Sequence, residues 1–370
     1  MKCKFIRFLL YIQNLIINFI KFFLFKSYSH TNECSEILIF RTGSLGDGVC
    51  AMPALSIIRK SFPNAKIDVI TNASSIKSKT SLGHLLDSNL YNVIYYNNFK
   101  ELFDVIQKNN YDLYIELTQN YDSLYTQLRN MFFIRFTGIP HAFGWCIQNI
   151  KSLSKWQEEC QLISSETNRL NQVLADEGLI INSADISYDF EIGPSDNDVV
   201  NNMLHNLNLD GDKKIITFVV GAKRAMNIWP IEHFMKVAEY LILRGYKILL
   251  VGGKGDEDNA SQIIKLKGTF NVIGKTSPIQ TGLIMSRTNL VISNDTGSMH
   301  LAYAFGTPVV AIFSGRDCGT KWYPPNKSDK VFKAENIHCS YCFSETCTNN
   351  ICMKKIKPES VITYLKDEGF

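Results

Sequence analysis

The stretch SNDTGSMHLA, residues 293–302, decides the fold that this chain predicts. It follows a short apolar run, Leu290–Ile292, and precedes Gly306-Thr307-Pro308 and a second apolar run, Val309–Phe313. Short apolar runs of this kind indicate buried strands. A polar turn, an apolar segment and a Gly-Thr-Pro stop indicate a helix that begins near Thr296. The sequence therefore predicts a βαβ unit whose polar turn lies at a helix N-terminus.

That helix N-terminus is a candidate anion site. Its first backbone N–H groups have no partner within the helix, and the helix dipole favours negative charge there. Thr296, Gly297 and Ser298 are therefore candidates to bind phosphate oxygens, and Gly297 would let a phosphate approach the backbone closely. The structural alternative is that Asp295 caps the helix and Gly297 only relieves the turn. Local chemistry leaves both interpretations open.

Length and composition set the broad class. The chain has 370 residues, 45% apolar and 20% charged, which is enough for two domains with full cores. The net charge of +4 is small, and no stripe of cations with interleaved aromatic residues is present, so we expect no nucleic-acid partner. Six of the ten cysteines are scattered along the chain, unlike a secreted disulfide framework, which favours a reducing cytoplasm.

An apolar segment, Phe5–Phe25, begins the chain, and we expect residues 1–30 to form a membrane-associating helix. Six side chains fall on one stripe at steps of three and four residues: Lys4, Arg7, Tyr11, Asn14, Asn18 and Lys21. This stripe favours a helix that lies in the membrane interface with its cations toward anionic headgroups. A single spanning signal anchor is the alternative, since about 21 residues just cross a bilayer core. A cleaved signal peptide is least favoured, because no small-x-small cleavage site follows.

The next segment predicts a βαβ unit with an acid in its loop. Glu36–Arg41 has the pattern of a buried strand, residues 42–48 of a Gly-rich turn, and Ala51–Lys60 of a helix with Pro53 in its first turn. The glycine spacing does not match the dinucleotide fingerprint, so the carboxylate of Asp47 is more informative than the glycines. Asp47 is either a turn former or helix cap, or a general base in the crevice beyond the strand.

The domain boundary is expected at Pro194, giving a first domain of residues 35–194 and a second of residues 195–370. Residues 151–167 are polar and without a clear period, and we expect a flexible substrate-facing segment there. In the second domain apolar runs alternate strictly with helical patterns, which predicts a parallel sheet covered on both faces.

Two loops of the second domain carry candidate ligand-binding charges. Asp256 follows a strand and a glycine turn, where a carboxylate either binds a ribose diol or complements a helix dipole. Lys223 and Arg224 follow another strand, where cations either neutralise a diphosphate leaving group or are simply solvated.

Three stretches agree in order and spacing with one known family. RTGSLGD at 41–47, WPIEHF at 229–234 and DTGSMHLA at 295–302 resemble glycosyltransferase family 9, the lipopolysaccharide heptosyltransferases. The resemblance covers roughly Glu36–Leu365. It implies an α/β GT-B fold, in which two Rossmann-like doubly wound domains face each other across a cleft. The family binds the acceptor on the first domain and the nucleotide-sugar on the second.

The resemblance also implies an activity: metal-independent, inverting transfer of a heptose from ADP-heptose, or of a related sugar, to a lipopolysaccharide core or another lipid-linked saccharide. No cofactor is expected, and the place is the cytoplasmic face of the inner membrane. By position Asp47 resembles the catalytic base, and Arg41 and Gly46 belong to the acceptor-side loop. The expected donor-binding residues, which include the two loop cations, are Lys223, Arg224, Asp256, Asp295, Thr296, Gly297, Met299 and His300.

One position departs from the family pattern. Members commonly carry a lysine two residues before the Trp-Pro pair, where it contacts the donor phosphate, but this chain has Asn227. Either Lys223 or Arg224 supplies the missing charge from the same loop, or the donor site is altered. Asn227 is also the reason to keep a catalytically silent sugar-binding or scaffold protein as an alternative function. A GT-B nucleotide-sugar epimerase is a second alternative, on fold-level analogy alone.

A cysteine cluster near the C-terminus has the spacing C-x2-C-x4-C-x4-C, formed by Cys339, Cys342, Cys347 and Cys352. Four thiolates this close are compatible with a tetrahedral structural zinc, although only one C-x2-C knuckle is present. Similar cysteine-rich tails occur in some members of the resembled family, where no metal is needed for the chemistry.

Overall fold

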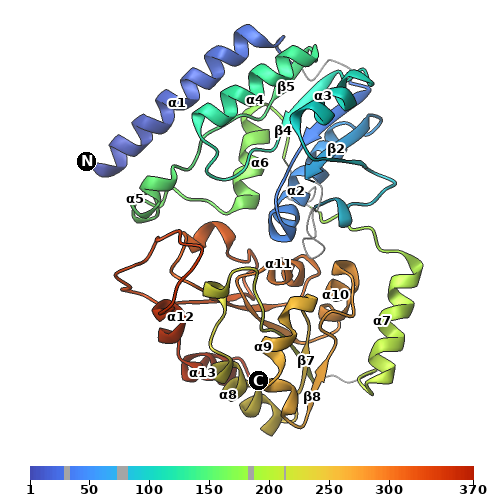
Figure 1. The fold of residues 1–370 in the computed structure, drawn as a ribbon, viewed down its shortest axis with the longest axis vertical. Coiled ribbons are helices and arrows are strands. Elements are labelled where there is room, and N and C mark those ends of the chain that lie inside the picture. The colour runs from blue at the N-terminus through green and yellow to red at the C-terminus, as the bar shows by residue number, and fades with distance from the viewer. Residues whose placement is uncertain (29–33, 73–81, 182–186, 212–213) are drawn as a thin grey trace. The chain divides into compact units, whose positions relative to one another are not determined.

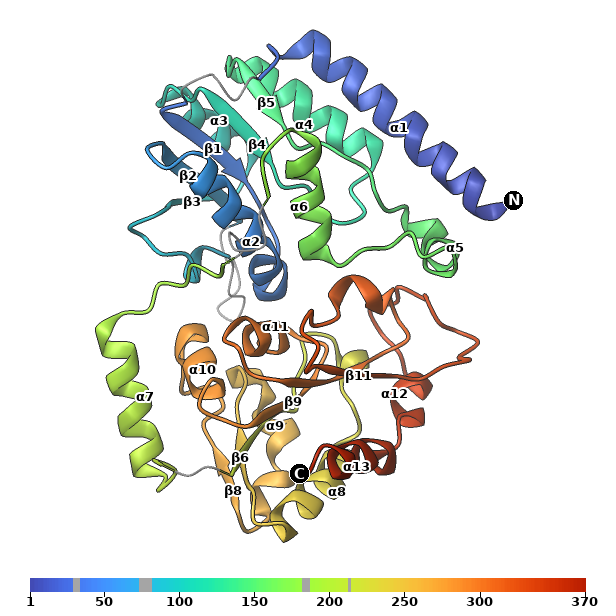
Figure 2. The same cartoon turned by 180° about the vertical axis from the view of Figure 1, so that it is seen from behind.

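The computed structural model describes residues 1–28, 34–72, 82–181, 187–211 and 214–370. The chain divides into two compact units, Met1–Glu191 and Ile192–Phe370, and each is built on its own parallel sheet (Figures 1 and 2). The predicted α/β class with two doubly wound parallel sheets is therefore confirmed. Residues 29 and 30 of the expected N-terminal segment lie outside the described residues.

The sheet of the first unit has the strand order β3-β2-β1-β4-β5. Its strands are β1 (Glu36–Phe40), β2 (Lys66–Asn72), β3 (Asn92–Tyr96), β4 (Leu113–Glu116) and β5 (His141–Phe143). The helices of this unit are α1 (Lys2–Leu24), α2 (Leu45–Ser61), α3 (Phe99–Gln107), α4 (Leu124–Thr137), α5 (Ser154–Glu159) and α6 (Glu166–Asp176). One core cluster joins side chains of α1, α3 and α4 to β1, β2, β4 and β5, so these three helices cover the same face of the sheet.

The second unit has the order β11-β10-β9-β6-β7-β8. Its strands are β6 (Ile215–Val219), β7 (Lys247–Leu250), β8 (Thr269–Asn271), β9 (Leu290–Asn294), β10 (Val309–Phe313) and β11 (Lys330–Lys333). Its helices are α7 (Pro194–Asn206), α8 (Ile231–Leu243), α9 (Glu257–Ala260), α10 (Pro278–Met285), α11 (Gly297–Ala304), α12 (Ile351–Lys355) and α13 (Pro358–Asp367). Trp229 and Phe234 are fully buried in the main core cluster of this unit.

Both sheets contain a point where the strand order reverses. In the first unit β1 pairs with β2 on one side and β4 on the other. In the second, β6 pairs with β7 on one side and β9 on the other. Open parallel sheets bind ligands beyond the carboxyl ends of the strands at such a switch point. The loops after β1, β4, β6 and β9 are therefore where sites are to be sought.

Two local expectations were wrong. The helix expected at Ala51–Lys60 begins six residues earlier, because Ser44 and Asp47 form an N-terminal cap and make Leu45 the first helical residue. Pro53 thus lies inside α2 and not in its first turn, at the cost of one helical hydrogen bond. The stretch 151–167, expected to be a flexible substrate-facing segment, contains α5 and the start of α6.

Helix α1 belongs to the first unit and lies beside α4 (Figures 1 and 2). Two members of its polar stripe bind this unit. Asn14 donates to the carbonyl of Ile147 at 2.7 Å and accepts from the backbone N–H of Ile147 at 2.8 Å. Lys21 forms an ion pair with Glu177 at 2.6 Å.

The rest of α1 is largely unburied. Its exposed large apolar side chains are Phe5, Phe8, Tyr11, Leu15, Ile16, Phe19, Phe22 and Phe23. In the described part of the chain, α1 is the one helix long and apolar enough to cross a membrane. A disulfide between Cys3 and Cys160 ties its first turn to the end of α5, a bond that the expectation of a reducing compartment did not foresee.

Candidate functional site

The loop after β1 places Asp47 in the first turn of α2. Its Oδ2 accepts hydrogen bonds from the backbone N–H of Ser44 at 2.8 Å and from the Ser44 hydroxyl at 2.7 Å. Gly43 has φ of +136°, and a Cβ there would lie 2.5 Å from the Asp47 Cβ, so only glycine fits beneath this carboxylate. Asp47 is therefore a helix cap, as one interpretation of the sequence had it. Both of these contacts go to Oδ2, so Oδ1 is not used in capping.

Arg41 connects this loop to the neighbouring strand across the switch point. The side chain is fully buried, and its Nη1 donates to the carbonyls of Leu117 and Thr118, which follow β4, at 3.2 and 2.8 Å. Its Nη2 donates to the backbone carbonyl of Asp47 at 3.2 Å. Arg41 thus fixes the end of the loop that carries the predicted base. Gly46 is buried beside Asp47 in the same turn.

Glu166, at the start of α6, forms a buried ion pair with Arg41. Its Oε1 accepts from Arg41 at 3.1 Å and from Arg169 at 2.8 Å, and its Oε2 accepts from Arg169 and Asn120, both at 2.8 Å. Burial alone would raise the pKa of Glu166, but the Arg169 and Arg41 guanidinium groups lower it to about 2. The loop after β1 therefore rests on a fully buried, ionised network.

In the second unit the switch point is bridged by a neutral side chain. Asn294, the last residue of β9, donates to the carbonyl of Val220 at 2.9 Å and accepts from the backbone N–H of Trp229 at 2.9 Å. This amide joins the end of β9 to the loop after β6. It also explains why Trp229 and the 293–302 stretch belong together in space although they are far apart in sequence.

The helix predicted after β9 is α11, with Thr296 at its N-cap position. No side chain of the described residues caps it, so Asp295 is not its cap. The first N–H groups of α11 thus keep the anion-binding capacity that the sequence indicated.

Asp295 lies half-buried among charged side chains. Burial, and then the nearby Asp317, raise its pKa to about 6, although Arg224, Lys321 and Arg316 act in the opposite direction. These three cations and two acids come from the loops after β6, β9 and β10. Lys321 is buried and paired with Asp317 at 3.0 Å, whereas Arg224 is partly exposed. The arrangement is suited to an anionic ligand, which would pair with Arg224 and would be repelled less when Asp295 is protonated.

Asn227, at the position where a lysine is common in the resembled family, is buried and fully engaged. It donates to Oδ2 of Asp295 at 3.1 Å and accepts from the Ser314 hydroxyl at 2.8 Å. Arg224, three residues earlier, donates from Nε to Glu345 at 2.9 Å. Arg316 donates to the same carboxylate at 2.6 Å. Two guanidinium groups of this region therefore share one carboxylate of the cysteine-rich segment.

The other expected donor residues differ in accessibility. Asp256 accepts from the backbone N–H of Gly253 at 2.8 Å and lies directly over Gly221, where a Cβ would come within 1.8 Å of its Oδ1. It therefore sits at the ends of β6 and β7, close to the switch point. Lys223 is exposed. Met299 is fully buried, and His300 is nearly so, with its Nδ1 3.0 Å from the Tyr303 hydroxyl.

The cysteine cluster does not form a metal site in the structure. Within the described residues, no three His, Cys, Asp or Glu side chains are grouped in a way that could hold a metal ion. The four thiols are free, and Cys339, Cys342 and Cys347 are exposed. The arrangement thus does not fit the structural zinc that the spacing suggested. Instead this segment contacts the loop after β10, where Tyr341 donates its backbone N–H to the carbonyl of Gly315 at 2.7 Å.

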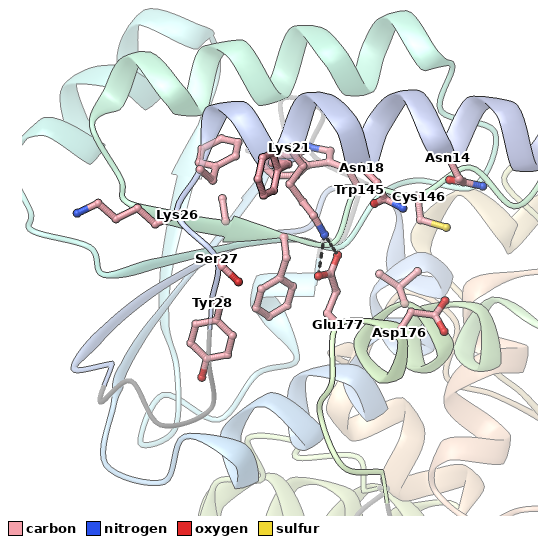
Figure 3. A pocket seen from close by; sticks show the side chains of 15 residues that line it. Asn14, Asn18, Lys21, Lys26, Ser27, Tyr28, Trp145, Cys146, Asp176 and Glu177 are labelled. Carbon is pink, nitrogen blue, oxygen red and sulfur yellow. Dashed lines mark hydrogen bonds and ion pairs between the residues drawn. The ribbon is translucent and has the colours of Figure 1, made fainter.

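A cavity of about 520 Å³ lies elsewhere, under the C-terminal half of α1 (Figure 3). Its wall includes the Lys21–Glu177 ion pair, Trp145 and the Cys146 thiol, whose pKa burial raises to about 11. The predicted site residues are not among those that line it. We therefore do not assign the predicted chemistry to this cavity.

Glu166, Arg169, Arg316 and Lys321 were not predicted from the sequence. Arg316 and Lys321 follow β10, so the rule that ligands bind beyond strand ends would have flagged them. Glu166 had no such signal, because its partner Arg41 is 125 residues away in sequence.

Solved structures share the fold of this chain over about nine tenths of its length. A glycosyltransferase family 9 protein of Veillonella parvula aligns with a TM-score of 0.72 at 19% identity, covering 93% of this chain and 98% of that one. The ADP-heptose lipopolysaccharide heptosyltransferase II of Escherichia coli aligns with a TM-score of 0.61 at 19% identity, covering 90% and 98%. The iron-containing glycosyltransferase TibC of enterotoxigenic E. coli aligns at 0.55 and 11% identity, covering 91% and 77%.

Sequence comparison adds the family. Lipooligosaccharide heptosyltransferase 2 of Haemophilus influenzae is 32% identical over 128 residues, which cover 33% of this chain and 36% of that protein. The chain spans about a third to about half of the length of the first curated relatives that it matches. The family model described as glycosyltransferase family 9 (heptosyltransferase) matches residues 99–352, well over half of the chain. This protein therefore belongs to glycosyltransferase family 9, the heptosyltransferase family.

Proposed function

We propose that this protein is an inverting glycosyltransferase that moves a heptose from ADP-heptose to a sugar of a lipopolysaccharide core or of another lipid-linked saccharide. The observation that carries this proposal is the charged cluster around Asp295, at the open N-terminus of α11 in a family 9 chain. The name of the E. coli structural neighbour, an ADP-heptose transferase, supports the choice of donor.

The donor side has the chemistry to hold a nucleoside diphosphate. When the sugar bond breaks, negative charge builds on the departing diphosphate. Fixed cations and backbone N–H groups stabilise that charge most in the transition state. Arg224, Arg316 and the N-terminus of α11 are the groups assigned to this task. Asp256 is assigned to the ribose hydroxyls, as its place at the ends of β6 and β7 suggests.

The acceptor side supplies the base. An acceptor hydroxyl attacks the anomeric carbon from the face opposite the diphosphate, forming the new glycosidic C–O bond as the old C–O bond breaks. ADP leaves with the bonding electron pair. Oδ1 of Asp47 takes the hydroxyl proton, since Oδ2 is occupied by Ser44. The proton then passes to solvent.

The test is to incubate the purified full-length protein with ADP-, UDP- and GDP-sugars and with truncated lipid-saccharide acceptors, and to identify products by mass spectrometry. An acceptor-dependent heptoside formed from ADP-heptose is the expected result. Donor binding without transfer to any acceptor would favour a silent sugar-binding protein, and a converted sugar nucleotide without glycoside would favour an epimerase. Repeating the assay with a chelator tests whether a metal takes part, which matters because the neighbour TibC contains iron.

We further propose that α1 holds the protein on the cytoplasmic face of the inner membrane, where lipid-linked acceptors lie. Its row of exposed aromatic and aliphatic side chains supports this assignment, because soluble proteins rarely expose so many together. The contacts of Asn14 and Lys21 with the first unit favour a helix that lies on the membrane over one that spans it. A spanning helix would have to leave these partners.

A further inference from the structure

The exposed apolar surface of the first unit does not end with α1. Helix α4 exposes three aromatic side chains, Tyr125, Phe132 and Phe136, with 75%, 47% and 79% of their surface accessible. Their spacing of seven and four residues places them on one face of the helix. The opposite face of α4 is buried in the core through Met131 and Ile134. These aromatic rings therefore do not serve the core of this unit.

The faces of α1 and α4 that point away from the sheet lie on the same side of the first unit. Ile17 of α1 and Met131 of α4 enter one core cluster with Leu38 of β1, so both helices cover the same face of the sheet. Figures 1 and 2 both show α4 running alongside α1 at the edge of the unit. Two neighbouring helices that bury their inner faces in one core expose their outer faces together. The exposed rings of α1 and α4 thus lie on the same side of the first unit.

The charges of this surface indicate what kind of partner it binds. Residues 1–28 and 124–137 contain no Asp or Glu and carry seven cations: Lys2, Lys4, Arg7, Lys21, Lys26, Arg129 and Arg135. Two of the seven are paired with acids of the first unit, Lys2 with Glu159 and Lys21 with Glu177, and the other five give the surface its positive charge. An apolar face bordered by cations is complementary to a bilayer with anionic headgroups. A second copy of the chain would bring the same cations to the same place, and the two faces would repel each other.

We propose that α1 and α4 together form one membrane-binding face, so that α1 lies flat on a bilayer containing anionic lipids and α4 inserts Tyr125, Phe132 and Phe136 beside it. This inference rests on the proposed membrane association of α1 and adds a second contact element from the folded core. It also fixes the orientation of α1. If α1 spanned the bilayer, its axis would stand upright and α4 would have no reason to touch lipid along its length.

Co-sedimentation of the full-length protein with vesicles tests the proposal, using phosphatidylcholine alone and phosphatidylcholine with phosphatidylglycerol. Three triple-serine variants are compared: an α4 variant (Tyr125, Phe132 and Phe136), an α1 variant (Phe8, Phe19 and Phe22), and a control with exposed apolar residues of the second unit (Val199, Leu243 and Ile264). We expect wild-type binding to require phosphatidylglycerol and to fall with salt. The α4 variant should bind about tenfold or more weakly, since each buried ring contributes, and the control should bind like wild type.

Because the α4 substitutions are at exposed positions, thermal unfolding should be unchanged. A second measurement removes no apolar side chain: dibrominated phosphatidylcholine in the same vesicles should quench the fluorescence of the Phe136→Trp variant more than that of the wild type. An α4 variant that binds like wild type while the α1 variant does not would overturn the role of α4 and leave the association of α1 intact. A wild-type protein that ignores all vesicles would overturn both. A self-association in the absence of lipid that the α4 variant abolishes would show the face to be a protein interface instead.

Discussion

At both switch points of this protein one side chain bridges two neighbouring strand ends. The bridging side chain is charged in the first unit and neutral in the second. In the first unit a buried cation, Arg41, ties the loop after β1 to the end of β4, and an ionised Glu166 holds it in place. In the second unit a neutral amide, Asn294, ties the end of β9 to the loop after β6. The charged side chains of the second unit lie near Asp295, and the bridging side chain Asn294 carries no charge.

This difference matches the tasks that we propose for the two units. A general base needs a fixed position and a carboxylate with one free oxygen, and a rigid ionic network beneath the loop provides the position. A diphosphate needs a cation that it can pair with. Arg224 meets this need, because its partner Glu345 is exposed, whereas Lys321 is buried and paired with Asp317. If the comparison is right, variants of the first switch point should affect catalysis and stability, and variants of the second should affect donor binding.

The largest effect is expected from Asp47→Asn. The amide keeps the shape and can still accept from Ser44, but it cannot take a proton, so kcat should fall by about 10² to 10⁴. Donor affinity, measured by titration calorimetry, should hardly change, because the donor residues lie in the other unit. Ser44→Ala is the matched control: it removes one contact to Oδ2 but keeps the carboxylate, and should lose far less. A variant retaining more than about a third of wild-type turnover would remove Asp47 from the mechanism.

The second effect concerns the network below the loop. In the Glu166→Gln variant, Arg41 and Arg169 stay buried without their counter-ion, which typically costs about 3 to 5 kcal/mol of unfolding free energy. Glu159→Gln is the control, since it breaks only the exposed pair with Lys2 and should cost about 0 to 1 kcal/mol. Urea unfolding measures both. Equal losses in the two variants would mean that the buried network does not hold the first switch point.

The sequence predicted where most of the candidate site residues lie in the fold, and the reason is local. Asp47 and the Asp295–His300 stretch follow apolar strands directly, so their place at the carboxyl edge of a sheet could be read from neighbouring residues. Glu166 and Arg316 act through partners far away along the chain, and no local pattern encodes such a pairing. The same holds for α1: its polar stripe was visible, but that Asn14 and Lys21 would bind Ile147 and Glu177 was not.

A third prediction compares one acid of raised pKa in each unit, the buried Glu116 and the half-buried Asp295. Burial raises the pKa of Glu116, at the end of β4, to about 7, and that of Asp295 to about 6. In the unfolded chain both titrate near their ordinary values, so the folded state binds protons more tightly. The stability that this gives is fully present below about pH 4 and is lost as the pH rises through the folded pKa values.

As the pH rises from about 4.5 to 7, ionisation of Glu116 should lower the unfolding free energy of the wild type by about 3 kcal/mol. The Glu116→Gln variant should not show this fall. The variant keeps the hydrogen bond from Asn130 but carries no charge at any pH. Unfolding followed at several pH values should therefore show a flatter profile than the wild type, with the contribution of Asp295 still present. An unchanged pH profile would show that Glu116 is ionised at little cost in the folded protein.

The smallest effect, and the sharpest test of the second switch point, concerns the cation of the loop after β6. Arg224 approaches Asp295 and is paired with the exposed Glu345, which a diphosphate can replace as partner. Arg224→Ala should therefore weaken kcat/KM by roughly tenfold to a hundredfold, the usual value of one charge-assisted hydrogen bond. Lys223→Ala, which removes an exposed cation from the same loop, is the matched control and should lose less.

Asn227→Lys then asks whether one cation in this loop is sufficient. A lysine at this position would replace the amide that now donates to Asp295, and would bring a positive charge to the place where the family commonly has one. In the Arg224→Ala background it should restore much of the lost kcat/KM, while in the wild-type background it should add little. The two effects would then be strongly non-additive in a double-mutant cycle, as expected for groups that neutralise the same phosphate. Strict additivity, or no loss from Arg224→Ala, would mean that this loop does not meet the diphosphate, and the charges around Asp295 would have to be explained by a different donor or by binding without transfer.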